Sequence, residues 1–375
     1  MHFKRAILGV ATSVALASAA KHQLFVGSFS TKFLYTLEYD DSLQTLGLAE
    51  TIPVNSASSW IALSYDKKNL YATDWEAVVP SFVSYSVDDA RTITYERRIS
   101  GDMSCSDSKS IFITANPNTP YTVYGNFFYG NAKCGSVMSV SANGSLSSVI
   151  QGFNYADGSA VHGTAISPNS QYLYSADHGT NSIWVHRMDD IDGTLKYLSQ
   201  SVMPTENAKP RHVVAHPEGK YIYAVMEGTS EVVQFSTSHL NNLTALQDKF
   251  SLIKEGEDPS DFWADEIALS ANNLYLWASN RAHDSGRKGY ISAFQVGEDG
   301  HITQQYFLTE TTSSGGFANA VAPSLFDDRV VAITDNTTGF VEVWKMNGEN
   351  TQAVPVAHLD IKDGGGCCAN AVWYS

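Results

Sequence analysis

One short phrase recurs about every 50 residues along this 375-residue chain. Each copy has an apolar run, then a turn, then a second run rich in aromatic residues. The clearest copies begin at His162 (HGTAISP, then YLY from 172) and at Arg211 (RHVVAHP, then YIY from 221). Five weaker copies begin near Ser59, Ile111, Asp265, Ala318 and Ala369.

Repeats of about 40–50 residues are typical of β-propellers, in which each repeat forms one four-stranded blade. The sequence therefore predicts an all-β fold, a seven-bladed β-propeller that forms a single domain over residues 21–375. The chain ends after one strand of the seventh copy, whereas residues 24–26 and 33–39 resemble the second and third strands of a blade. We expect the N-terminal strands to pair with the C-terminal strand, because this closes the ring and leaves no open sheet edge.

Alternating β-branched and aromatic residues predict the strands inside each repeat. Third strands are expected at residues 182–187, 231–235, 292–296 and 340–344, and fourth strands at residues 197–201 and 303–306. The one candidate for a helix is the segment 238–248.

The N-terminus has the pattern of a secretory signal peptide over residues 1–20. Lys4 and Arg5 precede an apolar run from Ala6 to about Ala17, and small residues follow up to Ala20. The apolar run is too short to span a bilayer; the alternative is a buried first strand. We therefore expect a secreted, extracellular protein. Three N-glycosylation sequons agree with export: Asn143, Asn242 and Asn336.

Four cysteines in an oxidising compartment allow three pairings. Cys105 and Cys134 flank the strands of the second repeat, which favours a disulfide between them. Cys367 and Cys368 are adjacent and either bond to each other or pair with the first two. No C-x-x-C spacing or histidine cluster accompanies them, so we expect no metal and no other cofactor.

The net charge of −15 would repel nucleic acids and anionic membranes, so neither is expected as a partner. A propeller gathers the starts of its inner strands around one central funnel, so residues scattered over the sequence can meet at a single site. The expected partner is a small-molecule substrate. We expect the loops between second and third strands at the opposite end of the blades.

Four polar residues interrupt the apolar phrases: His162, Arg211, Glu227 and Arg281. Two guanidiniums facing a channel would bind a carboxylate or an oxyanion, since each offers a planar fork of donors. A purely structural role is the alternative for each residue. The histidine would then be a hydrogen-bonded core group, and the arginines would pair with Asp265, Glu266 or Glu227 to tie blades together.

Three stretches resemble the lactonase-type seven-bladed propellers. They are KPRHVVAHP (209–217) with YAVME (223–227), EIALS (266–270) with LWASNR (276–281), and HGTAISP (162–168) with Asp177. This family includes the fungal 3-carboxy-cis,cis-muconate lactonizing enzyme, or carboxy-cis,cis-muconate cyclase, and bacterial 6-phosphogluconolactonase. The resemblance implies that His162, Arg211, Glu227 and Arg281 form the active site. It also implies that an exported member acts as an aldonolactonase.

The leading hypothesis is a metal-independent lactone hydrolase that acts on a sugar lactone. His162 would be the general base, and Arg211 and Arg281 would stabilise the carbonyl oxygen. Glu227 would orient one of these groups or protonate the leaving alkoxide. Asn280 and Asp265 would join the two arginines in binding substrate.

Three alternatives remain open. The same groups, working on an unsaturated diacid, describe a lactone-forming muconate cyclase. A propeller also serves as a non-catalytic scaffold that binds a protein or a glycan. A calcium-dependent lactonase would use oxygen ligands from Glu227, Asp265, Asn280 and Asn319.

Overall fold

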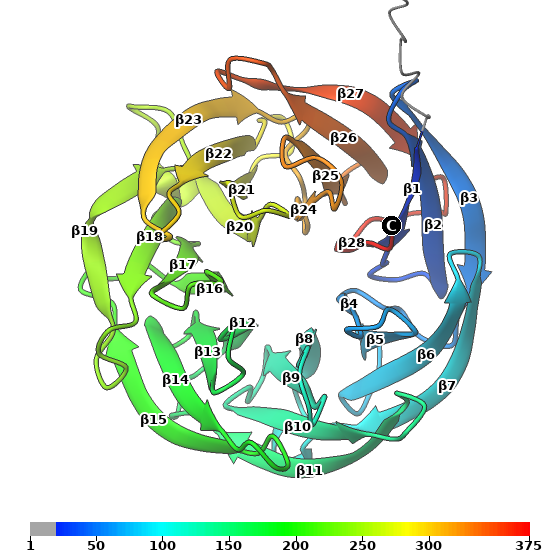
Figure 1. The fold of residues 1–375 in the computed structure, drawn as a ribbon, viewed down its shortest axis with the longest axis vertical. Coiled ribbons are helices and arrows are strands. Elements are labelled where there is room, and N and C mark those ends of the chain that lie inside the picture. Colours follow the sequence, from blue (N-terminus) through cyan, green and yellow to red (C-terminus); the bar gives the residue numbers. More distant parts are fainter. Residues whose placement is uncertain (1–19) are drawn as a thin grey trace, which may run out of the picture.

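The computed structural model describes residues 20–375, which form seven four-stranded antiparallel sheets arranged in a ring around a central axis (Figure 1). The predicted all-β, seven-bladed propeller is confirmed. Each of the seven phrases forms the innermost strand of a blade. These inner strands are β4 (Ile61–Leu63), β8 (Lys109–Ala115), β12 (Val161–Ile166), β16 (Pro210–Ala215), β20 (Phe262–Leu269), β24 (Val321–Pro323) and β28 (Ala371–Trp373).

The other three strands of each blade follow outward in the same order. The second strands are β5 (Asn69–Asp74), β9 (Val123–Phe128), β13 (Tyr172–Asp177), β17 (Tyr221–Met226), β21 (Tyr275–Ala282), β25 (Val330–Asp335) and β1 (Lys21–Val26). The third strands are β6 (Ser81–Asp89), β10 (Cys134–Val140), β14 (Ser182–Met188), β18 (Glu231–Ser236), β22 (Tyr290–Val296), β26 (Phe340–Met346) and β2 (Phe33–Asp40). The outermost strands are β7 (Thr92–Ser100), β11 (Leu146–Asn154), β15 (Leu195–Val202), β19 (Thr244–Ser251), β23 (Ile302–Glu310), β27 (Ala353–Asp360) and β3 (Thr45–Pro53).

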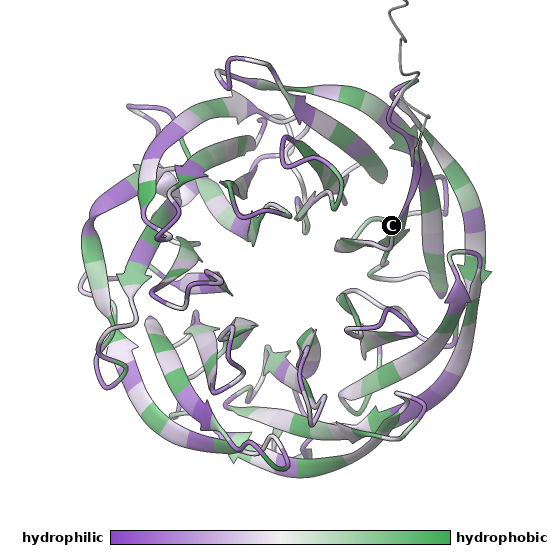
Figure 2. Ribbon diagram, viewed as in Figure 1, coloured by the Kyte–Doolittle hydropathy of each residue, from purple (hydrophilic) through white to green (hydrophobic). Residues whose placement is uncertain are grey.

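Burial follows the position of a strand in its blade. All six residues of β5 and of β25 are buried, because neighbouring blades cover both faces of these strands. The outermost strands contain both buried and exposed residues, as in β7 and β15. Figure 2 shows the same change from the inside to the rim, where hydrophilic and hydrophobic residues alternate along the outer ribbons. The core therefore lies between the blades, and the channel-facing positions remain free for polar groups.

The prediction of a candidate helix at 238–248 is wrong. This segment is a turn followed by strand β19, in which Thr244 and Ala245 pair with Ser236 and Phe235 of β18. Leu243, at the turn, is buried against the neighbouring blade, so its apolar character reflects packing between blades. The helical elements among residues 20–375 are two short 3-10 turns, Met103–Cys105 and Pro259–Asp261. No helix in this range is long and apolar enough to cross a membrane.

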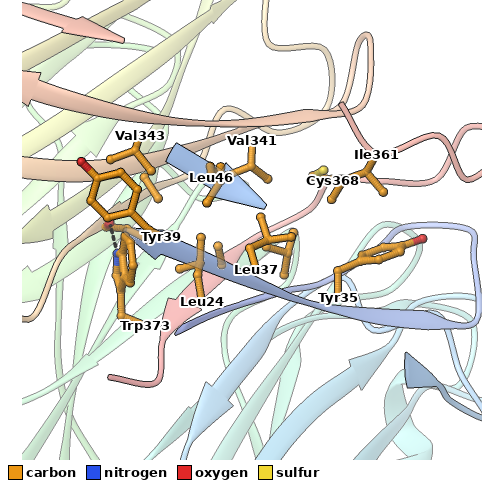
Figure 3. Packing of buried hydrophobic residues seen from close by; sticks show 14 of the residues in the cluster. Leu24, Tyr35, Leu37, Tyr39, Leu46, Val341, Val343, Ile361, Cys368 and Trp373 are labelled. Atoms are coloured by element: carbon orange, nitrogen blue, oxygen red, sulfur yellow. Dashed lines mark hydrogen bonds between the residues drawn. The ribbon is translucent and has the colours of Figure 1, made fainter. Parts of the chain in front are cut away.

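The two ends of the chain close the ring as expected. Strand β28 pairs with β1, with Trp373 opposite Leu24 and Ala371 opposite Val26, so that the last blade has the order β28-β1-β2-β3. Figure 3 shows the core of this closure, where Leu24, Tyr39 and Trp373 pack with residues of β26. The indole nitrogen of Trp373 also donates to the carbonyl of Ala322 at 2.8 Å.

The structure forms two disulfides, Cys105–Cys134, which is the pairing favoured by the sequence, and the vicinal pair Cys367–Cys368. The predicted signal peptide lies outside the described residues except for Ala20, and it stays a prediction.

The sequons Asn143 and Asn242 are exposed in turns, where glycosylation stays a prediction. Asn336 is half-buried and lines the central cavity described below. A glycan on Asn336 would obstruct that cavity.

Replacing Trp373 by alanine should destabilise the whole ring, because this residue joins the two ends of the chain and is only 4 % exposed. Loss of a buried tryptophan lowers the free energy of unfolding by about 3–5 kcal/mol. Urea unfolding of Trp373→Ala, with Leu43→Ala (70 % exposed) as the control, measures this loss. A change as small as that of the control would contradict the closure described here.

Candidate active site

β-Bulges place one residue from each of four consecutive blades in the cavity lining, and three of these residues are polar. The pairing of the inner strand with the second strand shifts between Ser110 and Phe112, Val161 and Gly163, Pro210 and His212, and Ala264 and Ile267. A bulge leaves its extra residue out of the ladder and re-aims the side chain. The extra residues are Ile111, His162, Arg211 and the pair Asp265 and Glu266.

The inner strands start at the same end of the blades at which the second strands finish. Val161, at the start of β12, pairs with Asp177, at the end of β13, because the two strands are antiparallel. The expectation that these two sets of loops lie at opposite ends is therefore wrong. This geometry brings His162 and Arg211 next to Glu227 and Arg281. Glu227 directly follows the second strand β17, and Arg281 lies near the end of the second strand β21.

All four predicted active-site residues, together with Asp265, line one cavity of about 590 Å³ in the central channel. The cavity has aromatic walls formed by seven residues: Phe29, Trp60, Trp75, Phe128, Tyr129, Trp263 and Phe317. Its ionisable lining is balanced, with the cations Arg211, Arg281 and Lys109 and the carboxylates Glu227, Asp265 and Glu76.

Two buried carboxylates hold the two arginines. Glu227 Oε2 lies 2.9 Å from Arg211 Nε and 3.8 Å from Arg281 Nη2. Asp265 Oδ1 contacts Arg211 Nη1 and lies 3.5 Å from Arg281 Nε. Arg281 Nη1 also donates to the carbonyl oxygen of Phe317 at 3.0 Å. The ion pairs that the sequence offered as the structural alternative therefore exist, and they lie inside the cavity.

The cluster keeps its carboxylates ionised. Burial acts to raise the pKa of Glu227, but a hydrogen bond with His178 and the charges of Arg211 and Arg281 outweigh it and lower this pKa to about 2. The hydrogen bond joins His178 Nε2 to Glu227 Oε1 at 3.1 Å. Burial opposes the ionisation of Asp265 as well, and the two arginines hold its pKa below the usual value.

His162 is a neutral imidazole at the side of this cluster. Burial and then the charge of Arg211 lower its pKa well below the usual value. Its Nδ1 lies 2.9 Å from Nε2 of His212, which leaves Nε2 as the nitrogen available to the cavity. A neutral imidazole beside two guanidiniums can exchange a proton with a bound molecule while the arginines stabilise developing negative charge.

Asn280 does not share the cavity lining with the other predicted residues. Its side chain is buried and bonded to backbone at both ends, donating to the carbonyl of Leu252 and accepting from the amide of Tyr290. Asn319 donates in turn to the carbonyl of Asn280 at 2.8 Å. Both asparagines thus tie loops together.

The residues offered for calcium do not fit a cation site. Glu227 and Asp265 are occupied by guanidiniums, and the side-chain amides of Asn280 and Asn319 bond to backbone groups. An added cation would lie against two arginine charges, which disfavours it.

The sequence reasoning missed two titratable residues beside the site, His178 and His212. It considered Glu266 only as an ion-pair partner of the arginines, whereas the structure pairs it with His212. His212 directly follows Arg211, and Glu266 directly follows Asp265; both preceding residues were predicted to be site residues. In a regular strand they would point to the opposite face. The signal that could have found them is the repeated pair of adjacent polar residues at the starts of the fourth and fifth phrases.

Comparison with known proteins agrees with the resemblance seen in the sequence. The family described as "Lactonase, 7-bladed beta-propeller" matches residues 23–352. The chain is 32 % identical over 370 residues to the carboxy-cis,cis-muconate cyclase of Neurospora crassa, covering 94 % of this chain and 99 % of that protein. It is 27 % identical over 353 residues to muconate cycloisomerase 1 of Cutaneotrichosporon cutaneum, covering 86 % and 90 %.

A third relative carries a different activity in its name. The 6-phosphogluconolactonase of Blochmanniella floridana is 24 % identical over 280 residues, covering 72 % of this chain and 76 % of that protein. The family match spans most of the chain and includes the segments that supply His162, Arg211, Glu227 and Arg281. This chain therefore belongs to the family of seven-bladed lactonase β-propellers.

Proposed function

We propose that this protein is a secreted lactone hydrolase that opens a neutral sugar lactone, an aldonolactone. The observation that carries this proposal is the charge balance of the cavity. The two arginines are matched by two carboxylates in direct contact, so the site offers hydrogen-bond donors without a net positive charge. A neutral ester carbonyl fits such a site. Family membership and the aromatic walls, which can stack on a sugar ring, support the same substrate class.

In the proposed reaction His162 Nε2 takes a proton from a water molecule that attacks the lactone carbonyl carbon. The carbonyl oxygen gains negative charge, which Arg211 and Arg281 stabilise by hydrogen bonds. The ring C–O bond then breaks, and the leaving alkoxide takes the proton from His162. The product is the open-chain hydroxy acid. Glu227 holds both guanidiniums in position, and Asp265 supports them from the other side.

The second candidate is a lactone-forming muconate cyclase. Two relatives favour it, since the proteins at 32 % and 27 % identity are named for muconate cyclisation. The arginines would then bind carboxylates while His162 moves the proton that accompanies ring closure. Carboxymuconate carries three carboxylates, however, and a charge-balanced lining gives little net attraction for a trianion. For this reason we rank hydrolysis first.

The purified protein should hydrolyse glucono-δ-lactone and should leave 3-carboxy-cis,cis-muconate unchanged. His162→Ala should lower kcat/KM by about 10²-fold or more, because it removes the base. Arg281→Met should lower kcat by about 10²–10³-fold, because it removes an oxyanion donor. His239→Ala and Arg91→Met, both at exposed positions, are the matched controls.

The two substrates distinguish the candidate functions. Turnover of carboxymuconate without lactone hydrolysis would establish the cyclase. A non-catalytic scaffold would be favoured if the protein turned over neither substrate and if His162→Ala and Arg281→Met both bound ligand as tightly as the wild type.

Glu227→Gln should alter stability in a pH-dependent way. The folded-state pKa of about 2 lies below the ordinary value of 4.5, so the ionised carboxylate stabilises the fold above pH 4.5. This stabilisation is lost as the pH falls from 4.5 towards 2. Wild type should therefore exceed the variant in unfolding free energy at pH 5, and this gap should narrow by about 3 kcal/mol at pH 2. Urea unfolding at both pH values measures the gap; a pH-independent gap would show that Glu227 is not held ionised by the arginines.

A further inference from the structure

A chain of three side chains crosses three blades behind the cavity. His162 on β12 contacts His212 on β16, with 2.9 Å between Nδ1 and Nε2. His212 in turn contacts Glu266 on β20, with 2.9 Å between Nδ1 and Oε2. The proposed reaction uses only His162, so the other two groups have no role in it.

His212 is positioned by tight packing. It is 1 % exposed, and its ring lies 4.8 Å from the ring of Trp60 and 5.6 Å from that of Phe112, measured between centroids. Gly163 provides the space, because a Cβ atom at this position would lie 2.3 Å from Cδ2 of His212. Neither His212 nor Glu266 lines the cavity. Any effect of this pair on substrate must therefore pass through a cavity residue that it contacts, which is His162 or Arg211.

The hydrogen bonds in this chain fix the tautomer of His162. A neutral imidazole carries one N–H, so each ring donates at one nitrogen and accepts at the other. If Glu266 is ionised, it accepts from His212 Nδ1, and His212 Nε2 then accepts from His162 Nδ1. This arrangement leaves Nε2 of His162 unprotonated and able to accept a proton from the cavity. If Glu266 is protonated, both bonds reverse, and His162 Nε2 carries a hydrogen.

We propose that Glu266 and His212 are positioning residues that set the protonated nitrogen of His162, so that the site acts as a base only when Glu266 is ionised. The inference rests on the proposed function and deepens it. It states that the protonation of Glu266, which lies outside the cavity, controls whether His162 can act as a base. The proton step is balanced, since the proton that His162 Nε2 takes from water later leaves with the alkoxide.

Charged groups from neighbouring elements act on both ends of this chain. Glu266 lies beside the carboxylate of Asp265 and within reach of Arg211. Arg211 Nη1 lies 3.4 Å from His212 Nδ1 and donates to it only in the state in which Glu266 is protonated and Nδ1 carries no hydrogen. Burial first, and then Asp265, raise the pKa of Glu266 well above its usual value, whereas Arg211 acts to lower it.

His162 faces the arginines of the cavity and His178 as well. Burial and the positive charges of Arg211 and Arg281 disfavour a cationic His162, so the ring stays neutral in both tautomers. The base form should therefore accumulate as the pH rises and Glu266 loses its proton.

The first test is the pH profile of glucono-δ-lactone hydrolysis. Wild-type kcat should rise with pH along one titration limb. Glu266→Gln should abolish this limb and lower the plateau of kcat at least about 10-fold, as expected when a catalytic histidine is held in the wrong tautomer. KM should stay within about twofold, because neither positioning residue reaches the cavity. Glu310→Gln, at an exposed position, is the control and should keep the wild-type profile.

The second test reads the tautomer without activity. In ¹⁵N NMR spectra of the wild-type protein, the Nε2 signal of His162 should move from the protonated to the unprotonated range as the pH rises. In Glu266→Gln it should remain protonated throughout, and His212→Gln should uncouple the two sites in the same way. An unchanged His162 signal and a wild-type pH profile in Glu266→Gln would overturn the inference. Absence of lactone hydrolysis by wild type would refute the proposed function alone, since the NMR result stands by itself.

Discussion

The pairing of two buried guanidiniums with two buried carboxylates is the interaction on which this site depends. An unpaired charge in this position would be strongly destabilising, so the ring can hold Arg211 and Arg281 near its centre only because Glu227 and Asp265 accompany them. These residues come from neighbouring blades and are fixed by the sheets that carry them. The same contacts that tie the blades together also orient the donors toward the cavity. Stability and preorganisation of the site therefore have one physical source.

The fold was predictable because propeller blades repeat their pattern. The spacing of the phrases located every inner strand, and the incomplete seventh phrase predicted the pairing of β28 with β1. The sequence signal for the four selected residues was that each interrupts an apolar phrase at a strand boundary. They meet in one cavity because the inner strands start where the second strands end. A helical period suggested the candidate helix at 238–248, but Leu243 is apolar because it packs between blades.

Other parts of the site depend on details that a sequence pattern does not carry. Strand alternation assigns adjacent residues to opposite faces, so Arg211 and His212 could not both be placed near the centre without the bulge at this position. Asn280 was predicted to bind substrate, but its side chain is turned into the blade, where it bonds to backbone. The inner and second strands share one end because they pair antiparallel, and the expectation of opposite ends was wrong for that reason.

Lactone hydrolysis and lactone formation need similar groups, and the net charge of the cavity is the ground on which we propose hydrolysis. A balanced cluster favours a neutral ring, and the carbonyl of that ring should lie between the arginines. The most direct measurement is a crystal structure of the protein bound to a sugar δ-lactam, which is a neutral analogue with a stable amide. The proposed mechanism predicts that the lactam oxygen contacts Arg211 and Arg281 and that Nε2 of His162 faces the carbonyl carbon. A lactam bound elsewhere on the propeller, or with its oxygen turned away from both arginines, would contradict this mechanism.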